Sequence, residues 1–404
     1  MHELSQMIKD DMKPALGVTE PGAIAFAVAK ARSFTKGDIK KVNVAMNSGM
    51  YKNAFTCGIP NSNEVGNVFA AALGVVAGNA DKGLESLADV TPEDNVKAQE
   101  MIDQGKITVE LSGITSRIFI EATVETEEDK AIVTIRDSHT NITKIIVNDK
   151  VELETEDEKK TEEDGGEEES HSIHKYTLQQ LYDYVTTVDI EEIRFINEAY
   201  KVNLELFHEG LENPRTTFAR QLLAINKGKE VSDDEQKTAS LMCNAAIEAR
   251  VIGLDKPAMS ITGSGAHGII ATMPLYAAYK VNGYTEEQLL RATALSYLVC
   301  MYIKEYSGRL SAFCGCAIAA GSGMACALVY LRGGTVEMMA HTLNNMASSI
   351  TGMICDGGNQ GCTMKGVAAV DVAYKSVEFA MNGIYISEVH GINGNTPEET
   401  MRNM

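Results

Sequence analysis

Between residues 107 and 153, apolar and polar residues alternate along the chain. The segments ITVEL, RIFIEATVET, KAIVTIRD and TKIIVNDKVEL place apolar residues at about every second position, and short polar turns separate them. A period of two puts the apolar side chains on one face of a strand. This pattern predicts an antiparallel sheet with one packed face.

The residues before this region mix helix and strand patterns. The sequence TEP at positions 19–21 is typical of a helix start, and the alanine-rich run that follows predicts a helix to about residue 34. A strand is expected over residues 41–47, and a second helix rich in small residues over residues 64–77. We expect these helices to cover the packed face of the sheet.

From residue 176 to the end, the apolar residues recur with a helical period. Runs such as TLQQLYDYVTTV and TASLMCNAAIEARVIGL fit 3.6 residues per turn. Glycines predict turns between the helices; they lie at 263–268, 308, 321–323, 333–334 and 357–361. The sequence therefore predicts an α+β protein, with a smaller N-terminal α+β domain over residues 1–153 and a mainly helical domain over residues 176–404.

Residues 154–175 between these domains are expected to form an acidic linker. From Glu152 to Glu169 there are eleven acidic residues and two lysines, a net charge of −9 out of −20 for the 404-residue chain. So polar a segment cannot bury enough apolar area to offset the entropy of ordering it, which favours a solvated loop. The excess of acidic residues also argues against a nucleic acid partner, because phosphate backbones are bound by clustered Lys and Arg.

The chain lacks the patterns of secretion and membrane insertion. The first 17 residues carry charges at helical intervals and hold no uninterrupted apolar core, unlike a signal peptide. The apolar run over residues 321–331 is too short to span a bilayer. We therefore expect a cytoplasmic protein without a membrane partner.

Cysteine is the residue type that indicates chemistry. Seven of the eight cysteines lie in the C-terminal half; the eight are Cys57, Cys243, Cys300, Cys314, Cys316, Cys326, Cys355 and Cys362. In a reducing compartment such a concentration favours a metal, iron–sulfur or catalytic site over disulfides. Cys243, Cys300 and Cys326 stand in apolar helical runs, where a thiol is expected to pack as a small apolar side chain.

Two glycine-rich segments hold the other C-terminal thiols. FCGCAIAAGSG contains a C-x-C pair, and CDGGNQGC, about forty residues later, contains a C-x6-C pair. Three or four thiolates can hold an iron–sulfur cluster, and four can hold zinc. The spacings match neither the usual zinc knuckles nor the ferredoxin runs, so a cluster, a zinc site and packed or redox-active thiols all remain open on the residues alone.

Five segments together resemble one family of enzymes. In order they are ALGVTEPGAIAFAVAKA, YKNAFTCGIP, GSGAHGIIATMP, IKEYSGRLSAFCGCAIAAGSG and ITGMICDGGNQGCTMK. They are similar to the L-cysteine desulfidases, which are related to the alpha-chain domain of iron–sulfur L-serine dehydratases. The resemblance implies a [4Fe-4S] lyase that releases pyruvate and ammonia from a small amino acid, with sulfide when the substrate is L-cysteine.

The same resemblance implies the cluster ligands. They would be Cys314, Cys355 and Cys362, with Cys316 as the near alternative to Cys314. Three protein thiolates would leave one iron open to act as a Lewis acid on the substrate.

A base must then remove the α-proton, and here the sequence departs from the pattern. The desulfidases read ALGCTEP, where the cysteine is the proposed base, whereas this chain has Val18. Cys57 and His267 are the candidate replacements: the first has the alternative of a buried small residue, and the second that of a loop histidine bonded only to backbone. The valine also favours a second hypothesis, a non-catalytic or differently specific relative.

Other polar residues in the matching segments are candidates for binding a substrate carboxylate. They are Lys52, Asn53, Arg309 and Lys365, with Lys304 beside them. Each is also explained as a surface charge or a helix cap. The expected partner is a small amino acid, and the small-residue helices would pack well in a homodimer.

Overall fold

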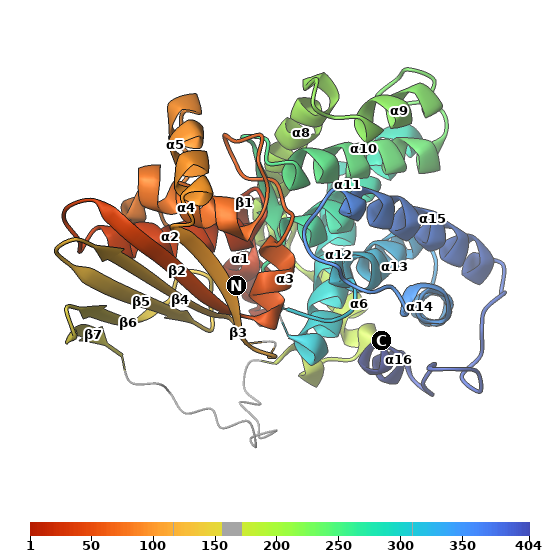
Figure 1. Cartoon of the computed structure of the whole chain (residues 1–404). Helices are drawn as coiled ribbons and strands as arrows, with labels where there is room; N and C mark the ends of the chain where they lie inside the picture. The colour runs from red at the N-terminus through yellow and green to blue at the C-terminus, as the bar shows by residue number, and fades with distance from the viewer. Residues whose placement is uncertain (116, 156–171, 309) are drawn as a thin grey trace.

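The computed structural model describes residues 1–115, 117–155, 172–308 and 310–404 (Figure 1). Most of the predicted acidic linker, and Arg309 among the candidate residues, lie outside these ranges. The N-terminal residues form a mixed sheet with helices packed on it, and the C-terminal residues form a helical assembly. The predicted α+β class is confirmed.

The N-terminal part is built on a six-stranded sheet in the order β3-β2-β4-β5-β6-β7. Buried and less buried residues alternate along the central strands, as the sequence predicts. The strands are β2 (Ile39–Asn47), β3 (Ile107–Gly113), β4 (Phe119–Thr126), β5 (Lys130–Arg136), β6 (Ile142–Val147) and β7 (Lys150–Glu154).

The sheet is mixed, and not antiparallel throughout. Four neighbouring pairs are antiparallel, but β2 and β3 run parallel, with Val42 opposite Ile107 and Val44 opposite Val109. Parallel neighbours need a long crossover connection. Three helices between β2 and β3 supply it, namely α3 (Ser48–Ala54), α4 (Asn67–Ala77) and α5 (Pro92–Asp103).

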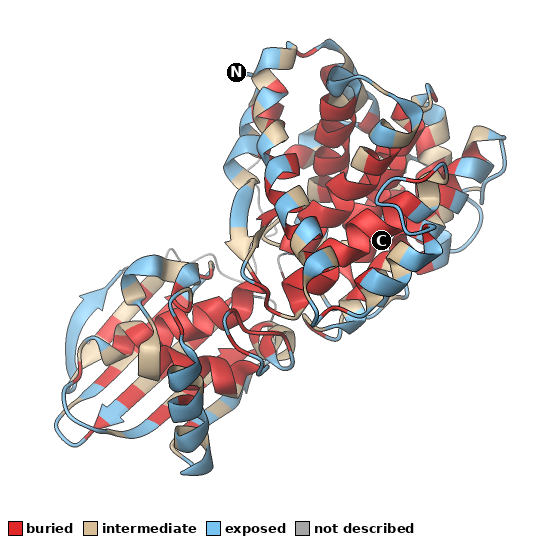
Figure 2. Cartoon of the chain, turned by 90° about the horizontal axis from the view of Figure 1, so that it is seen from above, coloured by how far each residue is buried: buried red, intermediate tan, exposed pale blue. Residues whose placement is uncertain are grey.

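Helices α2 (Thr19–Arg32) and α4 pack together and contact the sheet. Twelve of the fourteen residues of α2 are buried, because it is enclosed between the sheet, α4 and the short helix η1 (Ala80–Glu85). Figure 2 shows buried helical residues lying against the sheet in this part of the protein. Its alanines let the neighbouring elements approach closely. Because the helix is enclosed by these elements, it has no polar face.

The C-terminal part is helical and surrounds the buried helix α10 (Glu235–Val251), which packs against α8, α9, α11 and α15. Among the described helices, none combines the length and apolar character needed to cross a membrane. The other elements here are η2 (Ile173–Lys175), α6 (Leu178–Thr187), α7 (Ile190–Ile193), η3 (Arg194–Ile196), α8 (Asn197–Glu212), α9 (Phe218–Ile225), β8 (Pro257–Ser260), α11 (Gly265–Asn282), α12 (Glu286–Ser307), η4 (Cys316–Ala320), α13 (Gly321–Leu331), α14 (Val336–Ile350), α15 (Gly361–Met381) and α16 (Pro397–Asn403).

The first residues of the chain join the two parts. Helix α1 (Glu3–Asp11) contacts α12, and strand β1 (Lys13–Leu16) pairs antiparallel with β8. The two strands align Lys13 with Ser260 and Leu16 with Pro257. Because α2 follows β1 and α11 follows β8, this pairing brings the two helices together near their N-terminal ends. The domain limits at residues 153 and 176 stay a prediction.

The predicted turn at residues 321–323 is wrong, because these residues begin the buried helix α13. A Cβ atom on Gly323 would lie 2.2 Å from the backbone oxygen of Ser296 in α12. The glycine therefore serves close packing between two helices, and its conformational freedom is not needed there.

We expect Gly323→Ala to destabilise the protein, because the added methyl group meets backbone and the two helices must separate. The free energy of unfolding should fall by about 1–3 kcal/mol, measured by urea denaturation. Gly113→Ala is the matched control, since a Cβ atom there meets nothing within 4 Å. Equal stability of the two variants would contradict this account of α13.

Candidate active site

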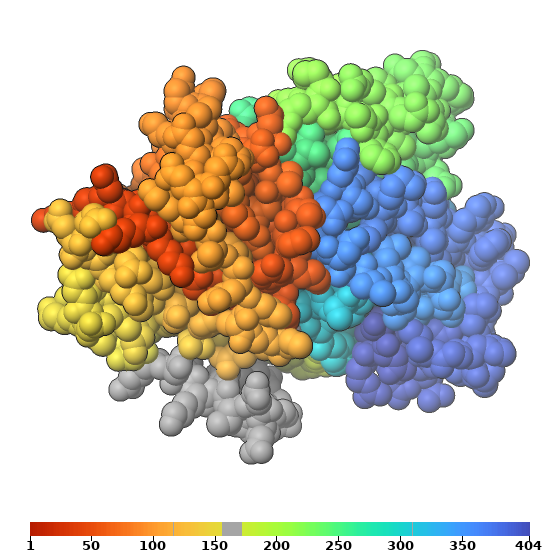
Figure 3. Space-filling view, in the orientation of Figure 1, coloured from red at the N-terminus to blue at the C-terminus, as the bar shows by residue number. Residues whose placement is uncertain are grey.

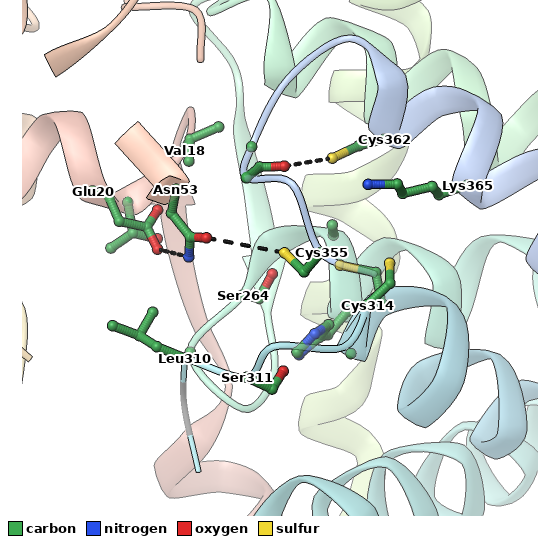
Figure 4. A pocket seen from close by; sticks show the side chains of 18 of the residues that line it. Val18, Glu20, Asn53, Ser264, Leu310, Ser311, Cys314, Cys355, Cys362 and Lys365 are labelled. Atoms are coloured by element: carbon green, nitrogen blue, oxygen red, sulfur yellow. Dashed lines mark hydrogen bonds between the residues drawn. The ribbon is translucent and has the colours of Figure 1, made fainter. Parts of the chain in front are cut away.

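A pocket lies where the N-terminal and helical parts meet, at the boundary visible between the orange and blue surfaces in Figure 3. The N-terminal part lines it with Val18, Thr19, Glu20, Asn53 and His139. The helical part contributes the loop before α11, the start of that helix and both thiol segments (Figure 4). The polar residues among these are Arg250, Ser264, His267, Lys304, Ser311, Cys314, Cys316, Cys355, Cys362 and Lys365.

Two backbone hydrogen bonds hold the thiol segments together. The amide of Cys314 donates to the oxygen of Met353 at 2.8 Å, and the amide of Cys355 donates to the oxygen of Ala312 at 2.9 Å. This bridge places Cys314 and Cys355 side by side although forty-one positions separate them. All four thiols of the two segments therefore line one pocket, so they can share one site.

The second thiol segment is packed tightly onto the N-terminal part. Gly357 has φ +101°, and a Cβ atom on it would lie 2.3 Å from the backbone oxygen of Lys52. The amide of Gly358 donates to the oxygen of Asn53 at 3.1 Å, and a Cβ atom on Gly358 would lie 2.8 Å from Val18. Only glycine fits this approach, so the glycines fix the loop against the wall that carries Val18.

The thiols occupy different electrostatic environments. A hydrogen bond between Cys316 and Cys314 lowers the pKa of the Cys314 thiol and raises that of Cys316, so the pair shares a proton. Burial raises the pKa of Cys362, whose sulfur lies 3.4 Å from the oxygen of Gly357. Cys314 is thus the thiol best prepared to act as a thiolate ligand.

The donor set suits an iron–sulfur cluster better than a preformed zinc site. Thiolates are soft ligands that clusters use, and glycine loops let backbone approach a bulky inorganic group. Within the described residues, no three His, Cys, Asp or Glu side chains are already gathered at metal-binding geometry.

His267 lies at the same pocket and is buried. Its Nδ1 is 2.5 Å from Thr262 Oγ1, and the Thr262 hydroxyl itself donates to the oxygen of Ile261 at 2.7 Å. Because that hydroxyl has one proton, the network assigns the ring proton to Nδ1 and leaves a lone pair on Nε2. Nε2 faces Gly315, where a Cβ atom would lie 2.8 Å away, so this lone pair points toward the thiol turn.

Burial, followed by the charges of Lys304 and Arg250, lowers the pKa of His267 well below its usual value. The imidazole is therefore neutral and able to accept a proton. Thr262, which orients it, has φ +52°, an unusual backbone conformation for a β-branched residue. The Thr262 amide donates to the Asp11 carboxylate, which holds this strained turn in place.

The structure separates the remaining sequence candidates. Cys57 is buried, is absent from the described lining of the pocket, and has its pKa raised by burial. Lys52 Nζ donates to the oxygen of Ser311 at 3.2 Å, outside the lining. Asn53 lines the pocket but donates to Glu20 at 2.8 Å, and Lys365 is paired with Asp356.

Three residues of the pocket were missed by the sequence analysis. Glu20 lies 3.9 Å from Nε2 of His139, and Arg250 is buried with 5% of its surface exposed. The signal for Arg250 was present in NAAIEARVIGL, where a Glu and an Arg interrupt a helix of small apolar residues. Charged side chains are seldom fully buried without a purpose.

Comparison with known proteins places the chain in a family. Residues 81–404 match the serine dehydratase alpha chain. The chain belongs to the serine dehydratase alpha chain family. The matched region contains all four pocket thiols, His267 and Arg250, whereas Val18 and Glu20 precede it.

Relatives that align with nearly the whole chain share the name UPF0597 protein. One from Clostridium botulinum (strain Hall) is 40% identical over 98% of this chain and 92% of its own length. Others, from Caldanaerobacter subterraneus subsp. tengcongensis and Bacteroides fragilis, are 36% and 34% identical, over 99% and 100% of this chain and 93% of their own lengths. Their shared name states no reaction.

In this serine dehydratase alpha chain relative, the buried neutral His267 should make the cluster-free protein less stable in acid. In the unfolded chain this histidine takes up a proton as the pH falls below its ordinary pKa of 6.5, whereas the folded one does so only at lower pH. The unfolded state therefore binds more protons, and stability falls as the pH drops through 6.5.

We expect His267→Gln to remove this pH dependence. Between pH 7 and pH 5.5, the stability difference between wild type and variant should shift by roughly 1 kcal/mol in favour of the variant, measured by urea denaturation. His390→Gln, at an exposed position, controls for the loss of an imidazole. A difference that is independent of pH would show that His267 is not held neutral.

Proposed function

We propose that this protein is an iron–sulfur-dependent lyase that catalyses β-elimination on a small L-amino acid. The reaction would convert L-cysteine to pyruvate, ammonia and sulfide, or L-serine to pyruvate and ammonia. In either case the α-proton and the β-substituent leave to give 2-aminoacrylate, which tautomerises to the imine, and water hydrolyses the imine to pyruvate and ammonia. A cytoplasmic location and a homodimer, both expected from the sequence, belong to the same proposal.

One observation carries the proposal. Four thiols from two distant segments line a single pocket together with a neutral histidine and buried cations, in a chain of the serine dehydratase alpha chain family. A purely structural thiol site would not need His267, Arg250 and Lys304 around it. Buried charged and titratable groups in a cleft are typical of catalysis.

A [4Fe-4S] cluster fits the donor set, with Cys314, Cys355 and Cys362 as its ligands and Cys316 as the alternative to Cys314. When bound, such a cluster supplies a Lewis-acidic iron that can stabilise charge developing on the leaving group. Gly315, Gly357 and Gly358 border the space that it would fill.

The residues of this chain supply the other requirements of the reaction. His267 Nε2 accepts the α-proton, since Thr262 fixes the ring, and burial together with the nearby cations keeps it neutral. Glu20 offers a carboxylate at the opposite wall, held by Asn53, that can pair with the substrate ammonium group. Glu20, Arg250 and His267 are themselves buried, where the lower dielectric constant strengthens such charge interactions.

We expect Cys314→Ser, Cys355→Ser and Cys362→Ser each to lose most of the bound iron, because serine is a poor ligand for a cluster iron. Iron and acid-labile sulfide should be measured after anaerobic purification, since a cluster with an open iron is sensitive to oxygen. Cys316→Ser tests the alternative ligand, and Cys326→Ala, in the core of α13, is the matched control. Unchanged iron in all of the first three variants would refute the ligand assignment.

Val18 supports a second candidate function, that of a family member without this elimination. The side chain lines the pocket and has 3% of its surface exposed, at the position where the desulfidase pattern has its cysteine. A valine cannot accept a proton. If His267 does not replace that cysteine, the pocket can bind an amino acid without converting it.

Pyruvate release from L-cysteine and L-serine under anaerobic conditions separates the two functions. If His267 is the base, His267→Gln should lower kcat on the order of 100-fold, whereas Val18→Cys changes it by less than about tenfold. An inactive wild type that Val18→Cys activates would instead establish the second function. Full activity of His267→Gln would remove the histidine from the mechanism.

A further inference from the structure

Arg250 is a buried cation whose partner is not found within the described part of the chain. It is near the end of α10 and lines the pocket, yet none of the described residues forms a hydrogen bond or ion pair with its guanidinium group. The Nε atom is buried and unsatisfied. A buried arginine left unpaired is costly, so the binding of an anionic ligand is the simplest explanation for its retention.

The surroundings of Arg250 also favour the binding of an anion. A Cβ atom on Gly265 would lie 2.6 Å from Arg250 Nε, so the guanidinium group lies directly against the first turn of α11. The N-cap residue of this eighteen-residue helix, Ser264, makes no side-chain cap. The first amides of a helix have no acceptor within it and carry partial positive charge. Two positive groups thus meet at one spot of the pocket.

The other cations of the pocket have partners. Lys365 is paired with Asp356, and Lys304 Nζ donates to Ser311 Oγ at 3.1 Å. Among the described candidates, Arg250 is therefore the cation with donors to offer. A guanidinium group matches the geometry of a carboxylate through two parallel hydrogen bonds.

We propose that Arg250 and the uncapped N-terminus of α11 form the binding site for the substrate's α-carboxylate. This inference rests on the proposed function for the identity of the acid. It also places the carboxylate next to His267, which lies in the first turn of the same helix. A substrate held there would have its α-proton near Nε2 of His267.

The test compares acids with their amides, which differ in charge and not in size. L-alanine and L-alaninamide serve as one pair, because neither has a β-leaving group and neither can be consumed. Propionate and propionamide, which lack the amino group, serve as the second. Binding is measured by calorimetry on the full chain purified without oxygen, for wild type, Arg250→Gln and Arg250→Lys.

We expect wild type to prefer each acid over its amide. Arg250→Gln should weaken acid binding by about 10- to 100-fold, the range for a charge-assisted hydrogen bond, and should leave amide binding within about twofold. The affinity of Arg250→Lys for the acids should lie between that of wild type and that of Arg250→Gln. Arg291→Gln removes a charge of the same kind from an arginine outside the described pocket lining and should leave the preference intact.

If Arg250→Gln does not fold, Gly265→Ala gives an independent test, because its methyl group displaces the guanidinium group. It should produce the same selective loss of acid binding. Equal weakening of acid and amide, or a wild type that does not prefer the acids, would overturn the proposal. A preference for propionate in a protein that lacks lyase activity would uphold the carboxylate site while refuting the proposed function.

Discussion

The candidate site depends on the short backbone bridge between residues 312–314 and 353–355. Its two hydrogen bonds, at 2.8 and 2.9 Å, join segments that are otherwise separated by α13 and α14. Side-chain contacts alone would leave two flexible glycine-rich turns with too many relative positions. The bridge fixes Cys314 next to Cys355, and the tight contact of Gly357 with Lys52 then fixes this pair against the N-terminal part. The start of α2, Asn53 of α3 and His139 thereby become a wall of the pocket.

A second constraint is electrostatic. Helices α2, α11 and α15 all begin at the pocket, and their N-terminal ends add to the charges of Arg250 and Lys304. A positive environment favours thiolates over thiols and keeps an imidazole neutral. The pKa of Cys314 is lowered chiefly by the hydrogen bond with Cys316, and that of His267 chiefly by burial. Nearby cations lower both further, through Lys365 for Cys314 and through Lys304 and Arg250 for His267. One arrangement of helix ends would thus serve the proposed cluster ligand, the proposed base and the proposed anion site.

The sequence predicted those features that depend on local pattern. Alternation along residues 107–153 predicted the strands, and the spacing of cysteines and glycines predicted that both thiol segments share a site. The parallel neighbour β3 was missed because strand pairing depends on the crossover through α3 to α5. Gly321 and Gly323 were misread as a turn, since a glycine in sequence does not reveal whether its backbone needs a rare φ or its neighbour needs the space. Arg250 and Glu20 were missed because burial, and not residue type, makes them unusual.

Val18 contributes to the shape of the pocket wall without supplying a titratable group. Valine and cysteine are close in size, and Val18 packs against Gly358 of the thiol loop, so the loop stays in place while methyl groups stand where a thiol could accept a proton. The wall is then apolar at this point, and under the proposed function the proton of a bound substrate goes to the other side of the pocket. There, His267 has a free lone pair and a ring held by Thr262. The backbone of Thr262, at φ +52°, is costly for a β-branched residue, and under the proposed function this cost is explained by an imidazole that must be aimed at the α-proton.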